Sequence, residues 1–389
     1  MTIADDERDP VFGNGPPIRL HRMLGLAGRI ERGEIRRALV VALLCWVPAF
    51  VLTGLGEALS WRVGLASFAS DVAFHTRSLV AAPLLVFAET FSGVKLRGIA
   101  QHFLDGGLVP AGERARFESS LASTQRLRDA PLAELVVALL AYATAFALLH
   151  ASNSGPAWRG AGSGPTPLYS LAGWWHALVS LPILLELVFG WIFRTILWTR
   201  FLWLVSRIPL RLVPAHPDLT AGMRFLGYSV RALSPVALGF GCIVAGTAAN
   251  GVLVRGDSLA AYRYAALALV LFVVVLFCAP LLVFIPRLLD TWRRGVFQYT
   301  AIADAVGREF ERKWFDPQRV DESVLQVEDF SATTDLYQVV ANVYEMKLIP
   351  LDLRSVIVLV VAALLPFVPV ILVALPFHVV LAKLATFLR

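Results

Sequence analysis

The sequence predicts an all-α, polytopic membrane protein of about seven transmembrane helices, with amphipathic helices on the cytoplasmic side. Three observations support this prediction, and the first two concern composition. Of the 389 residues, 57% are hydrophobic and only 16% are charged, against about 25% charged in soluble domains. The third observation is that the apolar residues form separate blocks. The length of each block is close to the ~20 residues that a helix needs to cross ~30 Å of hydrocarbon. The blocks do not alternate as the strands of a membrane barrel must, so helices are expected.

Each apolar block predicts one span. The first begins only near Ala38, after an acidic and polar start, so we expect an uncleaved anchor in place of a cleavable signal peptide. In the fifth block, small residues recur every four positions from Ala237 to Ala249, which favours close packing of helices. The predicted spans are 38–58, 78–94, 132–150, 173–199, 235–254, 265–286 and 355–376.

Lys and Arg predict the side on which each connection lies, because cytoplasmic loops carry an excess of both. With the N-terminus in the cytoplasm, the inner connections hold 26 of these residues and the outer connections hold five. Topology thus accounts for the net charge of +6, and nucleic acid is not expected as a partner. The predicted parts are a cytoplasmic N-terminal segment, 1–37; a transmembrane bundle, 38–286, with cytoplasmic loops 95–131 and 200–234; a cytoplasmic helical segment, 287–354; and a final block, 355–389.

The final block is too long for one upright span. The 31 residues from Ser355 to Ala385 would extend about 46 Å as a straight helix, and Pro366, Pro369 and Pro376 interrupt them. One interpretation is a single span followed by an interfacial helix at the C-terminus. The other is a broken hairpin that returns the last basic residues to the cytoplasm.

Two amphipathic helices are expected in the cytoplasmic segment 287–354. An apolar stripe of period three to four continues from Trp292 to Trp314 and predicts a helix that leaves the membrane and ends before Pro317. After an acidic stretch, a second helix is expected over 333–346. These helices could pack on each other, on the loop 95–131 or on a second subunit. The expected partners are therefore the lipid bilayer, another copy of the chain, or a cytosolic protein.

Three charged residues are candidates for an intramembrane polar site. Glu186 is expected near mid-depth, where a carboxylate costs several kcal/mol unless it is neutral, paired or facing water. Arg194 follows eight residues later, about 12 Å along the helix axis, so the two side chains cannot pair. We expect Glu186 to point into the bundle and Arg194 to reach the inner headgroups. Glu89, towards the inner end of the second span, is the third candidate. A protonated, hydrogen-bonded carboxyl and a role in coupling or permeation both fit Glu186.

A second candidate group lies at the outer face. Asp71 and His75 are four residues apart and would share one face of a helix, and Arg77 begins the second span. A polar outer vestibule and a simple interfacial anchor both fit these residues.

The stretch "RLVPAHPDLTAGMRFLG" (211–227) supplies cytoplasmic candidates: Arg211, His216, Asp218 and Gly222. As an elbow, it would start a helix at Pro217 and continue it to about Leu233, because proline suits the first helical turn and an acidic side chain complements the dipole there. As a functional site, His216 and Asp218 would contact a ligand or take part in gating or catalysis together with His102. No third ligand stands at usable spacing, so no metal site is predicted.

Three segments together resemble a family of uncharacterised bacterial multi-span inner-membrane proteins. They are "HTRSLVAAPLLVFAE" (75–89), the "LVPAHPD" stretch (212–218) and "DLYQVVANVYEMKLIPLD" (335–352). The resemblance implies a location in the bacterial inner membrane and carries no activity with it.

The sequence lacks the Walker loop, the dinucleotide fingerprint, the nucleophile elbow and the zinc-protease motif. No catalytic residue and no cofactor are therefore predicted. The first hypothesis for function is channel-like or transporter-like passage of a small ion or solute, which rests on Glu186 and on prolines within the spans. The alternative is a membrane scaffold or sensor that docks a cytosolic partner through residues 288–354. A membrane-embedded enzyme is a third, weaker hypothesis.

Overall fold

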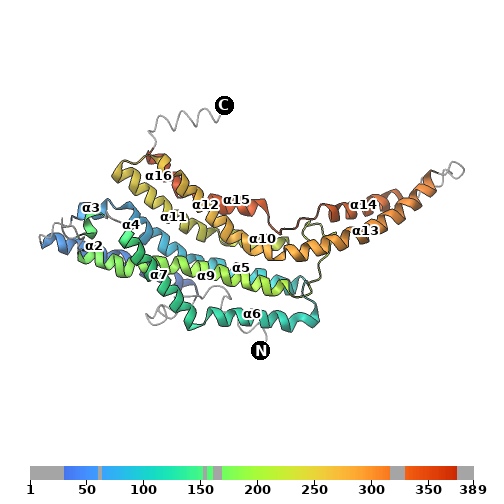
Figure 1. Cartoon of the computed structure of the whole chain (residues 1–389), viewed down its shortest axis with the longest axis horizontal. Coiled ribbons are helices and arrows are strands. Elements are labelled where there is room, and N and C mark those ends of the chain that lie inside the picture. The colour runs from blue at the N-terminus through green and yellow to red at the C-terminus, as the bar shows by residue number, and fades with distance from the viewer. Residues whose placement is uncertain (1–29, 60–63, 152–155, 161–168, 316–328, 375–389) are drawn as a thin grey trace, which may run out of the picture.

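The computed structural model describes residues 30–59, 64–151, 156–160, 169–315 and 329–374. Within these ranges the regular structure is helical, apart from an isolated bridge between Gly160 and Tyr169. Six helical segments are long and apolar enough to cross a membrane, and a bent pair supplies a seventh when counted as one span. The all-α polytopic fold is therefore confirmed. Figure 1 shows the spans side by side, with one pair of helices extending far beyond them.

The first four spans run from α2 to α9. They are α2 (Ile30–Ala58); the continuous series α4 (Val72–Thr76), η2 (Arg77–Ala81) and α5 (Ala82–Asp105); α7 (Pro131–Ala151); and the series α8 (Leu171–Trp175), η5 (His176–Ser180) and α9 (Leu181–Ser206). The short helices α3 (Leu65–Ala69) and η4 (Ala157–Arg159) lie in the connections at one end.

The remaining spans run from η6 to α16. The fifth span is the series η6 (Arg224–Leu226), α10 (Gly227–Ala232), α11 (Ser234–Asn250) and η7 (Gly251–Arg255). The sixth is the series η8 (Leu259–Tyr262), α12 (Arg263–Cys278), η9 (Ala279–Phe284) and α13 (Ile285–Trp314). The last is the bent pair α15 (Leu353–Leu364) and α16 (Phe367–Ala374).

Helices extend into both predicted loops. The segment 95–131 contains the end of α5, the short helix η3 (Ala111–Glu113) and α6 (Arg114–Arg128), which packs along α9. In the segment 200–234, α9 continues to Ser206 and α10 begins at Gly227. The helices thus continue beyond the predicted ends of the spans, and α6 packs on the extended part of α9.

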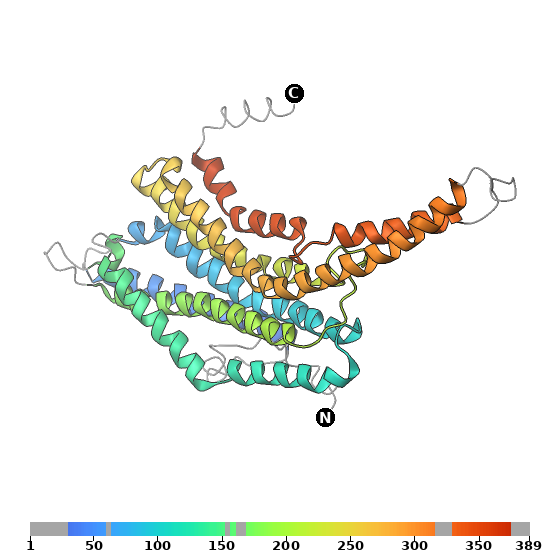
Figure 2. The same cartoon turned by 45° about the vertical axis from the view of Figure 1, so that its right-hand side comes forward.

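Helices α13 and α14 (Asp329–Tyr344) form an antiparallel pair that projects from the bundle, the "hairpin" below (Figures 1 and 2). Helix α13 ends at Trp314, as predicted, and α14 begins four residues before the predicted 333. Of the expected packing arrangements, the contact between the two helices is confirmed. The end of the bundle that carries this pair is called the hairpin end, and the opposite end is called the far end.

Close approach of helices at small residues holds the later spans together. A Cβ atom added at Gly241 of α11 would lie 2.2 Å from the carbonyl oxygen of Ala363 on α15. At Gly239 a Cβ atom would lie 2.7 Å from the side chain of Leu85 on α5. The close packing predicted for the fifth span is therefore confirmed.

The final block is bent. Helices α15 and α16 meet at an angle of 51°, with Pro366 between them, where a proline interrupts helical hydrogen bonding. The choice between an interfacial helix and a returning hairpin concerns residues 375–389, which lie outside the described ranges. Most of the predicted N-terminal segment, residues 1–29, also lies outside them.

Candidate functional site

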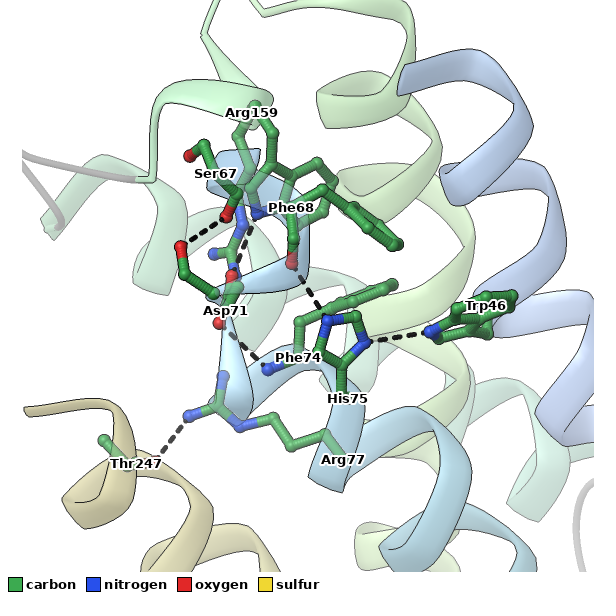
Figure 3. A network of polar contacts seen from close by, with 11 residues as sticks. Trp46, Ser67, Phe68, Asp71, Phe74, His75, Arg77, Arg159 and Thr247 are labelled. Carbon is green, nitrogen blue, oxygen red and sulfur yellow. Dashed lines mark hydrogen bonds and ion pairs between the residues drawn. The ribbon is translucent and has the colours of Figure 1, made fainter. Parts of the chain in front are cut away.

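The far end of the bundle contains a cluster of polar side chains, the far-end cluster: Asp71, His75, Arg77, Arg159 and His176. Figure 3 shows Arg159 reaching Asp71 at the start of α4, while His75 points towards Trp46 and Arg77 towards Thr247. The fifth, His176, begins η5. An apolar group of buried side chains, including Phe68, Phe74 and Trp158, surrounds the cluster. The predicted candidates Asp71, His75 and Arg77 thus lie together in the structure.

Asp71 is the anchor of the cluster and is only 2% exposed. Its Oδ1 accepts the backbone N–H of Phe74 at 3.0 Å, which caps α4. Its Oδ2 accepts the indole N–H of Trp158 at 3.0 Å and the guanidinium of Arg159 at 2.7 Å. The carboxylate therefore fastens the connection 156–160 onto the start of the second span.

Hydrogen bonds fix the tautomer of His75. An indole N–H can only donate, and that of Trp46 donates to Nδ1 of His75 at 2.9 Å. The ring proton must therefore sit on Nε2, which donates to the carbonyl of Phe68 at 2.9 Å. His75 and Asp71 share a short helical stretch but have separate partners. These contacts fit the interfacial anchor, and the polar outer vestibule stays a prediction.

Among the described residues Arg77 is hydrogen-bonded to no carboxylate, whereas Arg159 is bonded to Asp71. Arg77 is half-buried, and its Nη2 donates to the hydroxyl of Thr247 on α11 at 2.7 Å. Among the described residues its Nε has no hydrogen-bond partner, and Nδ1 of the buried His176 has none either. A cavity of about 10 Å³, near the volume that one water molecule requires, lies between these two side chains and is also lined by Ser78 and Ser180.

The cluster carries an excess of positive charge. Arg77 and Arg159 contribute two guanidinium groups, and Asp71 contributes the only carboxylate among the described residues of the cluster. A charge removed from water is costly without a partner, so this arrangement favours an anion.

Three π-helical segments occur at the far end: Arg77–Ala81, His176–Ser180 and Gly251–Arg255. Two of them begin with a cluster residue. A π-turn adds a residue to the helical turn and is frequent at functional sites. No sequence pattern predicted these segments, because helical periodicity differs too little over five residues.

A second polar group joins three helices nearer the hairpin end. Glu89 of α5 is buried and accepts from Nη2 of Arg37 and from Nη2 of Arg194, each at 2.6 Å. Arg194 is only 2% exposed and its guanidinium lies over the ring of Trp191. The prediction that Arg194 reaches the headgroups is wrong, because Glu89 supplies a carboxylate inside the bundle.

Glu186 is the remaining intramembrane candidate. It is half-buried on α9, and its charged neighbour is Glu134 near the start of α7. Tyr142 of α7 donates to the carbonyl of Leu178, so these two residues lie at the same height along the bundle. Glu134 is eight residues before Tyr142, and Glu186 is eight residues after Leu178. Both carboxylates therefore lie about 12 Å nearer the hairpin end than this hydrogen bond. Glu186 thus lies level with the first turns of α7, and its depth in the bilayer stays a prediction.

The predicted helix from Pro217 is also wrong, because helix resumes only at Arg224. The carboxylate of Asp218 instead collects three backbone N–H groups, from Thr220 at 2.8 Å and from Gly222 and Arg224 at 3.0 Å. Three residues take positive φ to make this possible: Leu219 (57°), Ala221 (56°) and Gly222 (91°). Burial raises the pKa of Asp218, but the three N–H groups outweigh it, so the pKa is lowered overall.

The loop 207–223 joins the hairpin to the bundle. The carbonyl of Leu219 accepts the N–H of Lys347 at 2.7 Å, and the N–H of Arg211 donates to Leu108 at 2.8 Å. The side chain of Arg211 is exposed, and Nδ1 of His216 lies 2.9 Å from Asp218. His102 packs its ring on Phe225, at 4.4 Å between centroids. No group of three or more His, Cys, Asp or Glu side chains in the described ranges could hold a metal ion.

No protein-family model matches the chain, and comparisons with curated proteins and with solved structures return no match.

Proposed function

We propose that this protein is a multi-pass bacterial inner-membrane protein that passes a small anion in a transporter-like manner. The far-end cluster is its point of entry, and the far end faces the periplasm when the N-terminus is cytoplasmic. The observation that carries the proposal is the charge of this cluster, in which the carboxylate of Asp71 pairs with Arg159 while Arg77 donates to the neutral hydroxyl of Thr247. Ionisable residues inside membrane spans are costly and typically mark the paths of ions and substrates.

The contacts of Arg77 support an anion as the missing partner. Its Nε points at no acceptor among the described residues, and the cavity beside it also meets His176 and Ser78. N–H and hydroxyl donors around a net positive charge suit a halide-sized anion, because each can donate to it. The small volume of the cavity excludes larger organic anions unless the helices move.

The polar groups along α5 support passage beyond the cluster. Glu89, with Arg37 and Arg194, is twelve residues from Arg77 on the same helical series, about 18 Å further towards the hairpin end. Charged side chains therefore occur at two depths of one helix. Arg77 and His176 each begin a π-helical segment. A change of such a segment to α-helix would move the side chains of Arg77 and His176.

Chloride flux into proteoliposomes tests this proposal, with the wild type compared with Arg77→Gln. Arg263→Gln is the matched control, because Arg263 is an exposed arginine of the same end. We expect flux above that of empty liposomes for the wild type and the control, and a loss of about ten-fold for Arg77→Gln. Thermal melting of each variant shows whether it is folded. A folded Arg77→Gln protein with wild-type flux, or a wild type with no flux of chloride, nitrate or bicarbonate, would overturn the proposal.

A scaffold function is the second candidate, and the exposed apolar side chains of the hairpin favour it. Phe297 is 79% exposed and Phe315 is 72% exposed, on helices that project beyond the bundle (Figure 2). Exposed apolar side chains on a projecting element are typical of docking surfaces. A cytosolic protein is the partner expected in the predicted orientation.

Cross-linking in intact cells tests the scaffold function. Phe297→Asp should abolish a cross-linked complex that the wild type forms, because it places a charge at the centre of the exposed apolar residues. Gln298→Asp is the matched control, since Gln298 is the next residue and is also exposed. Equal complexes with both variants, or none with the wild type, would exclude docking through this surface.

A further inference from the structure

We propose that the face formed by α5, α10 and α11 binds one anionic phospholipid. Its acyl chains would lie in an apolar groove between the spans, and its phosphate would lie in a basic pocket at the hairpin end. This site is separate from the far-end cluster, and the inference does not depend on anion passage.

The apolar groove has a volume of about 1000 Å³ and is lined by α2, by the series α4–η2–α5, by α11 and its η7 continuation, and by the α15–α16 bend. It follows the series α4–η2–α5 from Val72 to Phe87 and the series α11–η7 from Leu238 to Leu253, about 22 Å along each series. Thr76 is the one polar side chain among its described lining residues. The groove begins at Phe87, about 12 Å from Lys95 along α5, so the acyl chains of one leaflet, which cover about half of the ~30 Å of hydrocarbon, reach its hairpin-side part.

The basic pocket lies between α5 and α10 and has a volume of about 440 Å³. Lys95 and His102 line it from α5, and Tyr228 and Arg231 line it from α10. No acidic side chain lies among its described lining residues. Asp352, behind Arg231 at 3.6 Å, holds that guanidinium in place without entering the pocket.

The two spaces follow the same face of the same helices. One stripe of spacing three to four runs along η2 and α5 and passes through Phe91. It contains the groove residues Val80, Leu84 and Phe87 and the pocket residues Lys95 and Gly98. The ammonium group of Lys95 lies 3.7 Å above the ring of Phe91, at the border between groove and pocket. An amphipathic molecule with long chains and an anionic head matches this order.

The position of the basic pocket fits a lipid headgroup. It lies at the hairpin end, which the distribution of Lys and Arg assigns to the cytoplasm, and anionic lipids attract basic residues at that surface. A free phosphate would use only the pocket and would leave the apolar groove without a role. The combination of both therefore favours an anionic phospholipid over a soluble anion.

Lipid titration of the delipidated protein in detergent tests the inference by native mass spectrometry. Phosphatidylglycerol and phosphatidylcholine with identical chains are compared, and inorganic phosphate is the soluble competitor. We expect the wild type to bind phosphatidylglycerol at least ten-fold more tightly, and Lys95→Gln to lose about five-fold of that preference. Lys347→Gln, which removes an exposed lysine of the same end, should keep it. Phosphate should not compete.

A second variant tests the groove independently of the charge. Val80→Trp fills the groove from α5 at a position that is 48% exposed, so it should fold and should weaken the binding of both lipids. Equal affinity of the wild type for the two lipids, or Lys95→Gln with an unchanged preference, would overturn the inference. Displacement of the lipid by phosphate would assign the pocket to a soluble anion instead.

Discussion

Nη2 of Arg194 on α9 lies 2.6 Å from a carboxylate oxygen of Glu89 on α5, with both side chains buried. The other oxygen of Glu89 accepts Arg37 of α2 at the same distance. One carboxylate therefore connects three spans that are distant in the sequence. Removing one partner of a buried pair leaves a charge without compensation, and this sets the first prediction.

Glu89→Gln should destabilise the protein by about 3–5 kcal/mol, because two guanidinium groups then lose their carboxylate. Thermal and denaturant unfolding in detergent measure this loss. Glu118→Gln is the control: Glu118 forms an exposed pair with Arg114 on α6, and such pairs contribute about 0.5 kcal/mol or less. Equal stability of the two variants would show that Glu89 does not hold the spans together.

Asp218→Asn should loosen the loop 207–223, because a neutral amide accepts the three N–H groups less strongly than a carboxylate. We expect a loss of about 1–3 kcal/mol and faster amide hydrogen exchange at Thr220, Gly222 and Arg224. Unchanged exchange at these amides in Asp218→Asn would contradict the assignment of the carboxylate as their acceptor.

The same carboxylate predicts a pH dependence. Its pKa in the folded protein is lowered below the ~3.9 of an unfolded chain. The stabilisation is therefore fully present well above pH ~3.9 and is lost as the pH falls through the folded pKa. The difference in exchange between wild type and Asp218→Asn should shrink over that acidic range. A difference that grows on acidification would have the wrong sign for a lowered pKa.

Gly241→Ala should separate α11 from α15. The new Cβ would meet the carbonyl of Ala363 at 2.2 Å, and such overpacking costs about 1–3 kcal/mol. Gly98→Ala is the matched control, because a Cβ atom at that helical glycine would meet nothing within 4 Å. Melting curves that place Gly241→Ala at or above the control would refute the close approach.

Labelling of single cysteines on intact cells tests the orientation. The three native cysteines are buried or half-buried and free, so they should react little. A membrane-impermeant maleimide should modify Ser258→Cys at the far end directly, and Gln298→Cys on α13 only after the membrane is opened. The reverse pattern would place the hairpin in the periplasm.

Hydrophobic periodicity and block length were enough to predict the spans and the hairpin. The stripe from Trp292 to Trp314 predicted a helix that ends before Pro317, and α13 ends at Trp314, because both the period and Pro317 are local signals. The connection 95–131 was harder to predict. Its helix α6 is polar on most sides and is defined by contacts with α9, such as those of Arg200 with Ser123 and Thr124.

The partners of charged side chains could not be predicted from the sequence. Glu89 and Arg194 are 105 positions apart, and nothing local indicates that they meet. Glu186 stood out because it interrupts an apolar run, but its depth depends on how α9 is placed against α7. The helix predicted at Pro217 failed for a related reason. An acidic residue after a proline favours the start of a helix, but in the folded loop the carboxylate of Asp218 accepts three backbone N–H groups instead.

The most direct test of anion entry is a structure of the protein solved in bromide, with anomalous data collected at the bromine edge. Bromide replaces chloride and is visible by itself. The account predicts an anomalous peak between Arg77 and His176 that is absent from Arg77→Gln. A wild-type structure with no anomalous peak in the far-end cluster at high bromide concentration would contradict it.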